Sequence, residues 1–243
     1  MMRALTAQWR TELLLSLRQG EQLLVSVGIP VLALVFFSLV DVLPGRTGQA
    51  HAVGTLAPAV LALAVMSTAM VSLGIATGFE RYYGVLKRLG ATPLGRGRLV
   101  GAKAAMVLTV EGLQLLILVP VSILLGWRPG GTPILLVPAY LLGTAAFAGI
   151  GLLLAGTLRG TLNLAVCNAL YVVLLLFGGI VIPAARLPGP MAALARLLPS
   201  SALADVLHAA LTPGEPFPGS AWLVLTAWAV VMPVLAARLF RWE

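Results

Sequence analysis

The sequence predicts an all-α membrane protein with six transmembrane helices, and three observations support this fold class. Hydrophobic residues make up 60% of the 243 residues and charged residues only 10%, which cannot cover a water-facing surface but suits a lipid-facing one. Six apolar stretches are each about 20 residues long, enough to cross a hydrocarbon core about 30 Å thick. Lys and Arg gather in the loops on one side of these stretches. We therefore expect a single membrane domain over residues 1–243.

The six predicted spans are joined by short loops. They cover residues 23–43, 53–77, 104–125, 134–158, 162–182 and 221–237. An even number of spans places both termini on the same side of the membrane. That side would hold twelve of the sixteen Lys and Arg residues, so the positive-inside rule predicts that both termini are cytoplasmic.

Residues 1–22 precede the first span and predict a helix that lies along the membrane surface. Large apolar side chains recur every four residues, as one face of a helix requires, and three arginines are placed to reach lipid phosphates. The apolar positions are Leu5, Trp9, Leu13 and Leu17, and the arginines are Arg3, Arg10 and Arg18. An ordinary polar lead-in to the first span remains the alternative, because the arginines do not separate cleanly from the leucines.

The loop after the second span contains a short two-faced segment at residues 79–89. On a helical wheel, one face carries Phe79, Tyr82, Leu86 and Leu89, and the opposite side carries Glu80, Arg81, Gly84, Lys87 and Arg88. Gly90 and then Thr92-Pro93 supply helix stop signals. The pattern predicts one amphipathic helix that packs one face on the membrane domain and offers the other to a protein. The alternative is a basic loop that only enforces topology.

The motif in this loop resembles that of type 2 ABC exporter permeases. Residues 80–94 read ERYYGVLKRLGATPL and are followed by Gly101-Ala102-Lys103. The similarity extends over almost the whole chain, because that family also has an amphipathic cytoplasmic N-terminus, six spans and an outer segment between the fifth and sixth spans. Here that outer segment is residues 183–220.

The resemblance implies a permease subunit in a bacterial inner membrane that pairs with a second copy and with cytoplasmic ATPase subunits. It would export an amphipathic drug-like molecule, a lipid or a glycan, and its fifth span would lie near the second copy. The chain has no Gly-Lys dipeptide and so no phosphate-binding loop of the usual kind. We therefore expect ATP and Mg at the partner subunit, no cofactor on this chain and no enzymatic activity of its own.

Within this framework, residues 79–89 would be the coupling helix that contacts the ATPase subunit. The predicted contact residues are Phe79, Glu80, Arg81, Tyr82, Tyr83, Gly84, Lys87, Arg88, Leu89, Thr92 and Pro93. The net charge of +8 does not indicate nucleic-acid binding, because the basic residues flank apolar spans and suit anionic lipid headgroups.

Glu111 is an acidic residue well inside a predicted span, and we predict that it lies on the translocation pathway together with Asn163 and Asn168. A buried acid in a membrane could line a cavity, bind a cationic group or relay a proton. The alternative is a protonated or paired side chain that bonds to a neighbouring helix, with Gln114 or the two asparagines as partners.

Two amphipathic pieces separated by Pro199 follow the fifth span. Residues 191–198 and 203–211 each place leucines on one side, which predicts short outer helices that enter the outer leaflet or form a re-entrant plug. The histidines, His51 and His208, are not at a metal-ligand spacing, so no metal site is expected.

Two other classes of protein remain possible on the residues alone. An ATP-independent secondary transporter or channel would be favoured by an inverted repeat, and none is apparent. An intramembrane enzyme would need a nucleophile–base pair, a metal cluster or a carboxylate pair inside the spans, and the sequence places none there.

Overall fold

The computed structural model describes residues 6, 8–11, 13, 14, 20–39, 49–90, 96–180 and 188–241. Every regular element among these residues is a helix, which confirms the all-α class. The elements in chain order are α2 (Gly20–Leu39), α3 (Gln49–Met66), η1 (Ser67–Ser72), α4 (Leu73–Tyr82), α5 (Val85–Gly90), α6 (Arg96–Leu124), η2 (Pro133–Leu135), α7 (Leu136–Thr157), α8 (Gly160–Phe177), α9 (Gly189–Arg196), α10 (Pro199–Leu211) and α11 (Gly219–Leu239).

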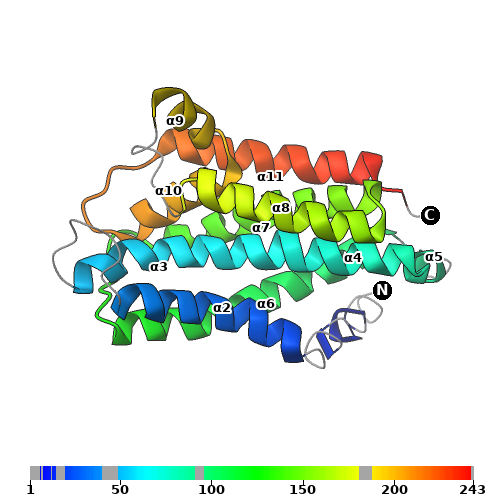
Figure 1. The fold of residues 1–243 in the computed structure, drawn as a ribbon, viewed down its shortest axis with the longest axis horizontal. Coiled ribbons are helices and arrows are strands. Elements are labelled where there is room, and N and C mark those ends of the chain that lie inside the picture. Colours follow the sequence, from blue (N-terminus) through cyan, green and yellow to red (C-terminus); the bar gives the residue numbers. More distant parts are fainter. Residues whose placement is uncertain are drawn as a thin grey trace.

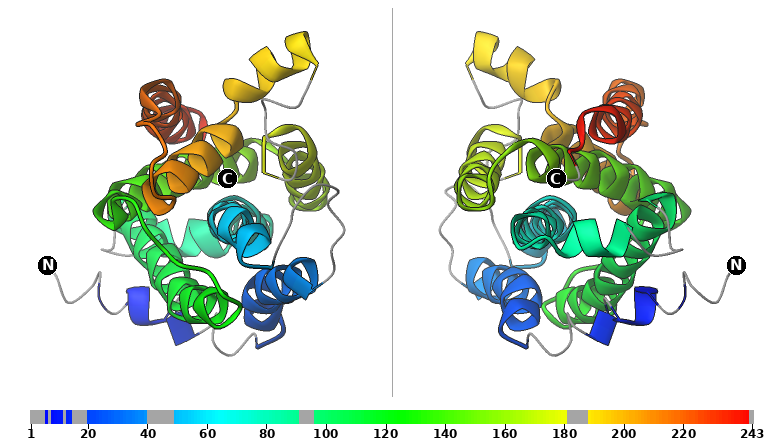
Figure 2. Two further views of the ribbon diagram at one scale, coloured as in Figure 1. Left: turned by 90° about the vertical axis from the view of Figure 1, so that its left-hand side faces the viewer. Right: turned by 90° about the vertical axis from the view of Figure 1, so that its right-hand side faces the viewer.

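The long helices form a bundle in which α3 and α4 run through the middle. Viewed along its axis, this central rod is surrounded by α2, α6, α7 and α8, with α11 on the far side of α7 (Figure 2). The helix α5 and the last residues of α11 lie at one end of the bundle, and α9 lies at the other (Figure 1).

Among the described residues, five helices are long and apolar enough to cross a membrane. They are Val53–Tyr82, Gly97–Leu124, Pro133–Thr157, Gly160–Phe177 and Gly219–Leu239, and they match the second to sixth predicted spans. The first predicted span, 23–43, corresponds to α2, whose apolar stretch Val27–Ser38 is shorter. The bent pair α9 and α10, at 80° to each other, would count as a sixth span if taken together.

Three predicted boundaries differ from the structure by five residues or more. The third span was predicted to begin at residue 104, but α6 begins at Arg96. The fifth span was predicted to reach residue 182, but α8 ends at Phe177, because the Gly178-Gly179 pair allows the backbone to leave the helix and Gly179 adopts a φ of +76°. The second span was predicted to end at residue 77, but the helix continues to Tyr82. Its 30 residues span about 45 Å, which exceeds a hydrocarbon core of about 30 Å, so its last turns extend beyond the lipid.

Large apolar side chains cover the outward faces of the bundle. Leu116, Leu124 and Leu223 are among the exposed residues of this kind on α6 and α11. A soluble monomer rarely exposes continuous apolar faces, whereas lipid tails accept them. The surface therefore agrees with the composition in placing this chain in a membrane.

The central rod contains a π-helical turn, η1, between α3 and α4. At this turn the rod approaches α7 closely, since a Cβ added to Gly151 would lie 2.6 Å from the carbonyl oxygen of Met70. Glycine on α7 is what permits this backbone contact. The approach brings the middle of α7 against the middle of the rod.

Two predicted segments lie partly outside the described residues. Of the predicted surface helix 1–22, the described residues before α2 are helical, and Trp9 donates a hydrogen bond from Nε1 to Thr109 Oγ1 of α6 at 3.2 Å. Whether the segment lies along a membrane stays a prediction. Of the predicted outer segment 183–220, residues 183–187 are outside the described part, and the remainder contains α9 and α10 at the end of the bundle opposite α5.

Candidate functional site

The segment predicted as one coupling helix is two helices joined by a sharp turn. Helix α4 ends at Tyr82, Gly84 has a φ of +70°, and α5 starts at Val85. The turn is closed by the backbone amides of Tyr83 and Gly84, which donate to the carbonyl oxygens of Phe79 (2.9 Å) and Arg81 (3.0 Å). The prediction of a continuous helix over 79–89 was therefore wrong, because a glycine that adopts a positive φ ends a helix.

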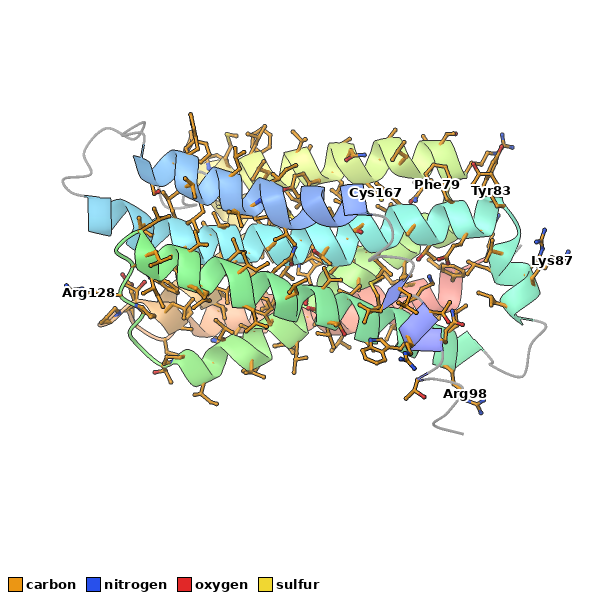
Figure 3. All side chains as sticks on the ribbon, turned by 90° about the horizontal axis from the view of Figure 1, so that it is seen from below. Phe79, Tyr83, Lys87, Arg98, Arg128 and Cys167 are labelled. Atoms are coloured by element: carbon orange, nitrogen blue, oxygen red, sulfur yellow. The ribbon has the colours of Figure 1, made fainter. Side chains whose placement is uncertain are left out.

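The break changes which side chains share a face. Tyr82 and Tyr83 are 64% and 65% exposed, whereas Leu86, predicted to lie on the same face as Tyr82, is 1% exposed. Phe79 stacks on Tyr83 with ring centroids 6.1 Å apart, and Tyr82 meets Tyr83 edge-on at 5.2 Å. We call Phe79, Tyr82 and Tyr83 the aromatic corner. It projects from the same end of the bundle as Lys87 (Figure 3).

Helix α5 packs back onto the bundle through a small apolar cluster. Leu86 and Leu99 are buried, and Leu89 and Phe240 pack against them. We call these four residues the α5 seat. Because Leu99 belongs to α6 and Phe240 directly follows α11, the seat connects the short helix to two membrane helices in addition to α4.

Two of the predicted ATPase contacts bond within the chain. Lys103 Nζ of α6 lies 2.7 Å and 2.8 Å from the two carboxylate oxygens of Glu80. Arg81 donates from Nη1 to the carbonyl oxygen of Ala155 at 2.7 Å, in the last turn of α7, where a cation is favourable. These bonds join α4 to α6 and α7. Tyr82, Tyr83, Lys87 and Arg88 remain as predicted contacts with exposed side chains.

The other predicted contact residues have mixed outcomes. Gly84 forms the turn, and Leu89 belongs to the α5 seat. Thr92 and Pro93 lie outside the described residues. Contact of any of these residues with an ATPase stays a prediction.

A second group of polar side chains lies in the middle of the bundle. Thr144 of α7 donates a hydrogen bond to Glu111 Oε2 of α6 at 2.5 Å, and Gln114 Nε2 donates to Thr68 Oγ1 of η1 at 3.0 Å. Tyr140 lies one turn before Thr144 on the same face of α7. We call Glu111, Gln114, Thr68, Tyr140 and Thr144 the mid-membrane polar cluster. All five are buried.

The structure separates the three residues predicted to share a translocation pathway. Asn163 of α8 is buried and donates to the carbonyl oxygen of Gly74 at 2.8 Å, so it joins α8 to α4. Asn168 is exposed and bonds to Leu164 within its own helix. Among the described side chains, Glu111 accepts its hydrogen bond from Thr144. Within this described part of the chain it is not bonded to Gln114 or to either asparagine, which were the predicted partners.

Sequence reasoning missed Thr144 because a threonine in an apolar helix carries no signal of its own. Its relevance arises from the way α6 and α7 face each other. The break at Gly84, in contrast, could have been predicted from the glycine.

A family model described as ABC-2 type transporter matches residues 3–211. This range contains the aromatic corner and the mid-membrane polar cluster, and it ends at the last residue of α10. Among curated proteins, none matches the chain.

Proposed function

The chain belongs to the ABC-2 type transporter family, and we propose that its α4–α5 turn is where an ATPase subunit acts on the membrane helices. Members of this family are membrane permease subunits of ABC transporters, and they work with an ABC ATPase partner. We further propose that this permease is a homodimer and exports an amphipathic drug-like molecule, a lipid or a glycan. ATP and Mg would bind to the partner subunit.

The observation that carries the proposal is the aromatic corner, with its exposed Tyr82 and Tyr83, beside the basic residues of α5. Aromatic side chains anchor protein interfaces because they bury a large area at low entropic cost. Lys87 and Arg88 are exposed on α5 and would pair with acidic groups of the partner. Exposed ion pairs contribute at most about 1 kcal/mol each, so most of the binding energy is expected from Tyr82 and Tyr83.

Contacts between the α4–α5 turn and the rest of the bundle would transmit a movement of the ATPase subunit to several membrane helices at once. The α5 seat touches α6 and the residue after α11, Glu80 is paired with α6, and Arg81 is bonded to α7. A displacement of α5 would therefore move the ends of these helices together, as rigid-body switching requires.

The distribution of charge supports a cytoplasmic location for this end. The described basic residues on the elements at this end include Arg81, Lys87, Arg88, Arg98, Lys103, Arg159, Arg238 and Arg241. Arg128 lies at the opposite end (Figure 3), and Arg196 is the last residue of α9 at that end. By the positive-inside rule, the end with α5 would face the cytoplasm of a bacterium and both termini would lie there. Family membership weighs against the ATP-independent transporter or channel considered from the residues alone.

A route for an amphipathic cargo at the outer end is supported by α9. Its large apolar side chains Met191 and Leu194, and Leu197 just after it, are exposed, and α9 projects sideways from the bundle (Figure 2). Such a helix would rest among lipid tails of the outer leaflet, where an amphiphile leaving the bundle would be released.

Co-purification tests the coupling site. We expect the tagged permease to recover an ABC ATPase from native membranes, and the double variant Tyr82→Ala with Tyr83→Ala to lower that recovery at least about tenfold, since loss of a hot-spot residue costs about 2 kcal/mol. Arg128→Ala, an exposed change at the other end, is the matched control and should recover the ATPase normally. Full recovery and full cargo export by the tyrosine variant would contradict the proposal.

A further inference from the structure

The mid-membrane polar cluster contains a carboxyl group that the coupling mechanism does not use. Glu111 is 1% exposed and lies near the middle of α6, thirteen residues before its last residue, Leu124. Thr144, which donates a hydrogen bond to Glu111, likewise lies near the middle of α7. The carboxyl group is therefore placed where a charge is most costly in a membrane.

The hydrogen bonds of the cluster leave two oxygen atoms without partners. Thr144 occupies Glu111 Oε2, and Gln114 and Thr68 satisfy each other through bonds of 3.0 Å and 3.2 Å. Glu111 Oε1 and the Tyr140 hydroxyl are buried and have no hydrogen-bond partner among the described residues. An unpartnered polar atom in a buried site costs free energy, and the cost is much larger when the group is ionised than when a proton makes it neutral.

No described cation is placed to neutralise Glu111. The basic residue nearest to it along α6, Lys103, lies eight residues earlier, about 12 Å along the helix axis, and is already paired with Glu80. Among described residues, the elements packed against this part of α6 are α2, α3, η1 and α7, and the titratable group facing Glu111 from them is Tyr140. A buried carboxylate without a cation is strongly unfavourable, whereas a neutral carboxyl group is tolerated.

From this geometry we infer that Glu111 is a proton-binding site, with the proton carried on Oε1 while α6 and α7 pack together. In this form Oε2 is a carbonyl oxygen that accepts from Thr144. The O–H bond forms with a proton taken from water, and the proton returns to water when the helices separate and the carboxyl group is hydrated. This inference does not depend on the proposed function.

A proton fits the site better than a metal ion does. Calcium takes six to eight oxygen ligands, but the described atoms here offer only two oxygens without partners. A cationic group of a cargo molecule would need access that the buried carboxyl does not provide in this packing. A proton needs a single oxygen and no cavity.

The site is placed to link proton binding to helix packing. Gln114, one turn from Glu111 on the same face of α6, bonds to Thr68 in the π-helical turn η1, and π-helical turns are frequent at functional sites. The packed state binds the proton and the separated state releases it, so by linkage low pH favours packing and rising pH favours separation.

Infrared spectroscopy of the purified chain in lipid nanodiscs tests the protonation directly. At neutral pH we expect a protonated-carboxyl band that Glu111→Gln lacks. Glu215→Gln is the matched control, because Glu215 is a 43% exposed carboxyl at the outer end, and it should retain the band. The same protonated-carboxyl absorption in the wild type and in Glu111→Gln at neutral pH would show an ionised Glu111 and overturn the inference.

A second variant keeps the inference testable if Glu111→Gln does not fold. Thr144→Val removes the hydroxyl that donates to Oε2 and should shift the carboxyl band to higher frequency, because its carbonyl loses a hydrogen bond. An unshifted band would contradict the assignment of the proton to Oε1.

Hydrogen exchange measures the linkage to packing. The measured quantity is the hydrogen-exchange rate of the α6 backbone amides in the wild type divided by the rate of the same amides in Glu111→Gln at the same pH. We expect this ratio to rise as the pH rises. A ratio that does not change with pH would mean that protonation of Glu111 has no influence on helix packing. A ratio that responds only when a cationic cargo is added would instead indicate a cargo-binding role and would also overturn the inference.

Discussion

The aromatic corner and the mid-membrane polar cluster show two ways in which one chain handles polar groups. Beside the corner, Lys87 and Arg88 face water, and Glu80 is paired at short distance with the buried Lys103. In the cluster, Glu111 has one hydrogen bond to a hydroxyl and one buried oxygen without a described partner. Water screens the exposed charges of Lys87 and Arg88, and the low dielectric of the bundle strengthens the electrostatic interactions of the buried cluster. Substitutions in the cluster should therefore cost more stability, and those at the corner should mainly affect binding.

The largest effect is expected where the cluster's helices touch backbone to backbone. Gly151→Leu would place a side chain against the carbonyl of Met70, since even a Cβ there would lie 2.6 Å from that oxygen. Backbone cannot give way as a side chain does, so we expect a loss of about 3 kcal/mol or more in the free energy of unfolding. Thermal unfolding in detergent micelles measures it.

Gly112→Ala is the control for this substitution, because a Cβ added to Gly112 of α6 meets nothing within 4 Å. It should leave stability nearly unchanged or slightly higher, given the better helix propensity of alanine. Equal stability of Gly151→Leu and Gly112→Ala would show that α7 and η1 do not pack as closely as described.

An intermediate effect is expected from Thr144→Val, which keeps the shape and removes the hydroxyl. Glu111 would lose its hydrogen bond from α7, and the unsatisfied buried group should cost about 1–3 kcal/mol of unfolding free energy. Thr157→Val is the matched change, because Thr157 is exposed and bonds only to carbonyls of its own helix. Chemical denaturation should separate the two variants. If Thr144→Val and Thr157→Val lower the free energy of unfolding equally, burial does not explain the difference between the polar cluster and the surface.

The smallest effect on stability is expected from Lys87→Ala on α5, beside the aromatic corner. Its side chain is exposed on α5, so unfolding free energy should change by less than about 0.5 kcal/mol. Binding to the ATPase subunit should weaken about two- to fivefold, as the loss of one exposed ion pair allows, and the deficit should shrink at high salt. Binding titrations at two salt concentrations test this. A larger stability loss than that of Thr144→Val would reverse the comparison.

The two regions also differ in how far the sequence could predict them. The location of the corner followed from the basic loop and its stop signals, but not its shape, because the helical wheel treated Gly84 as one more polar position. For Glu111, its depth in α6 was predictable from the apolar residues on either side. Its partner was not predicted, since the sequence suggested Gln114 or the asparagines, and Thr144 became apparent only from the rotation of α7.

Composition, apolar length and the placement of arginine and lysine determined by themselves that this chain is a helical membrane protein, with spans close to those observed. These features depend on the local hydration of each segment and on the thickness of the lipid bilayer, so they can be predicted from the sequence without knowing how the helices pack. The tertiary structure alone decided that α5 rests on Leu99 and Phe240, that Arg81 binds the end of α7, and that Thr144 meets Glu111. Each of these contacts depends on the rotation and offset of neighbouring helices, which arise from side-chain packing among residues far apart in sequence.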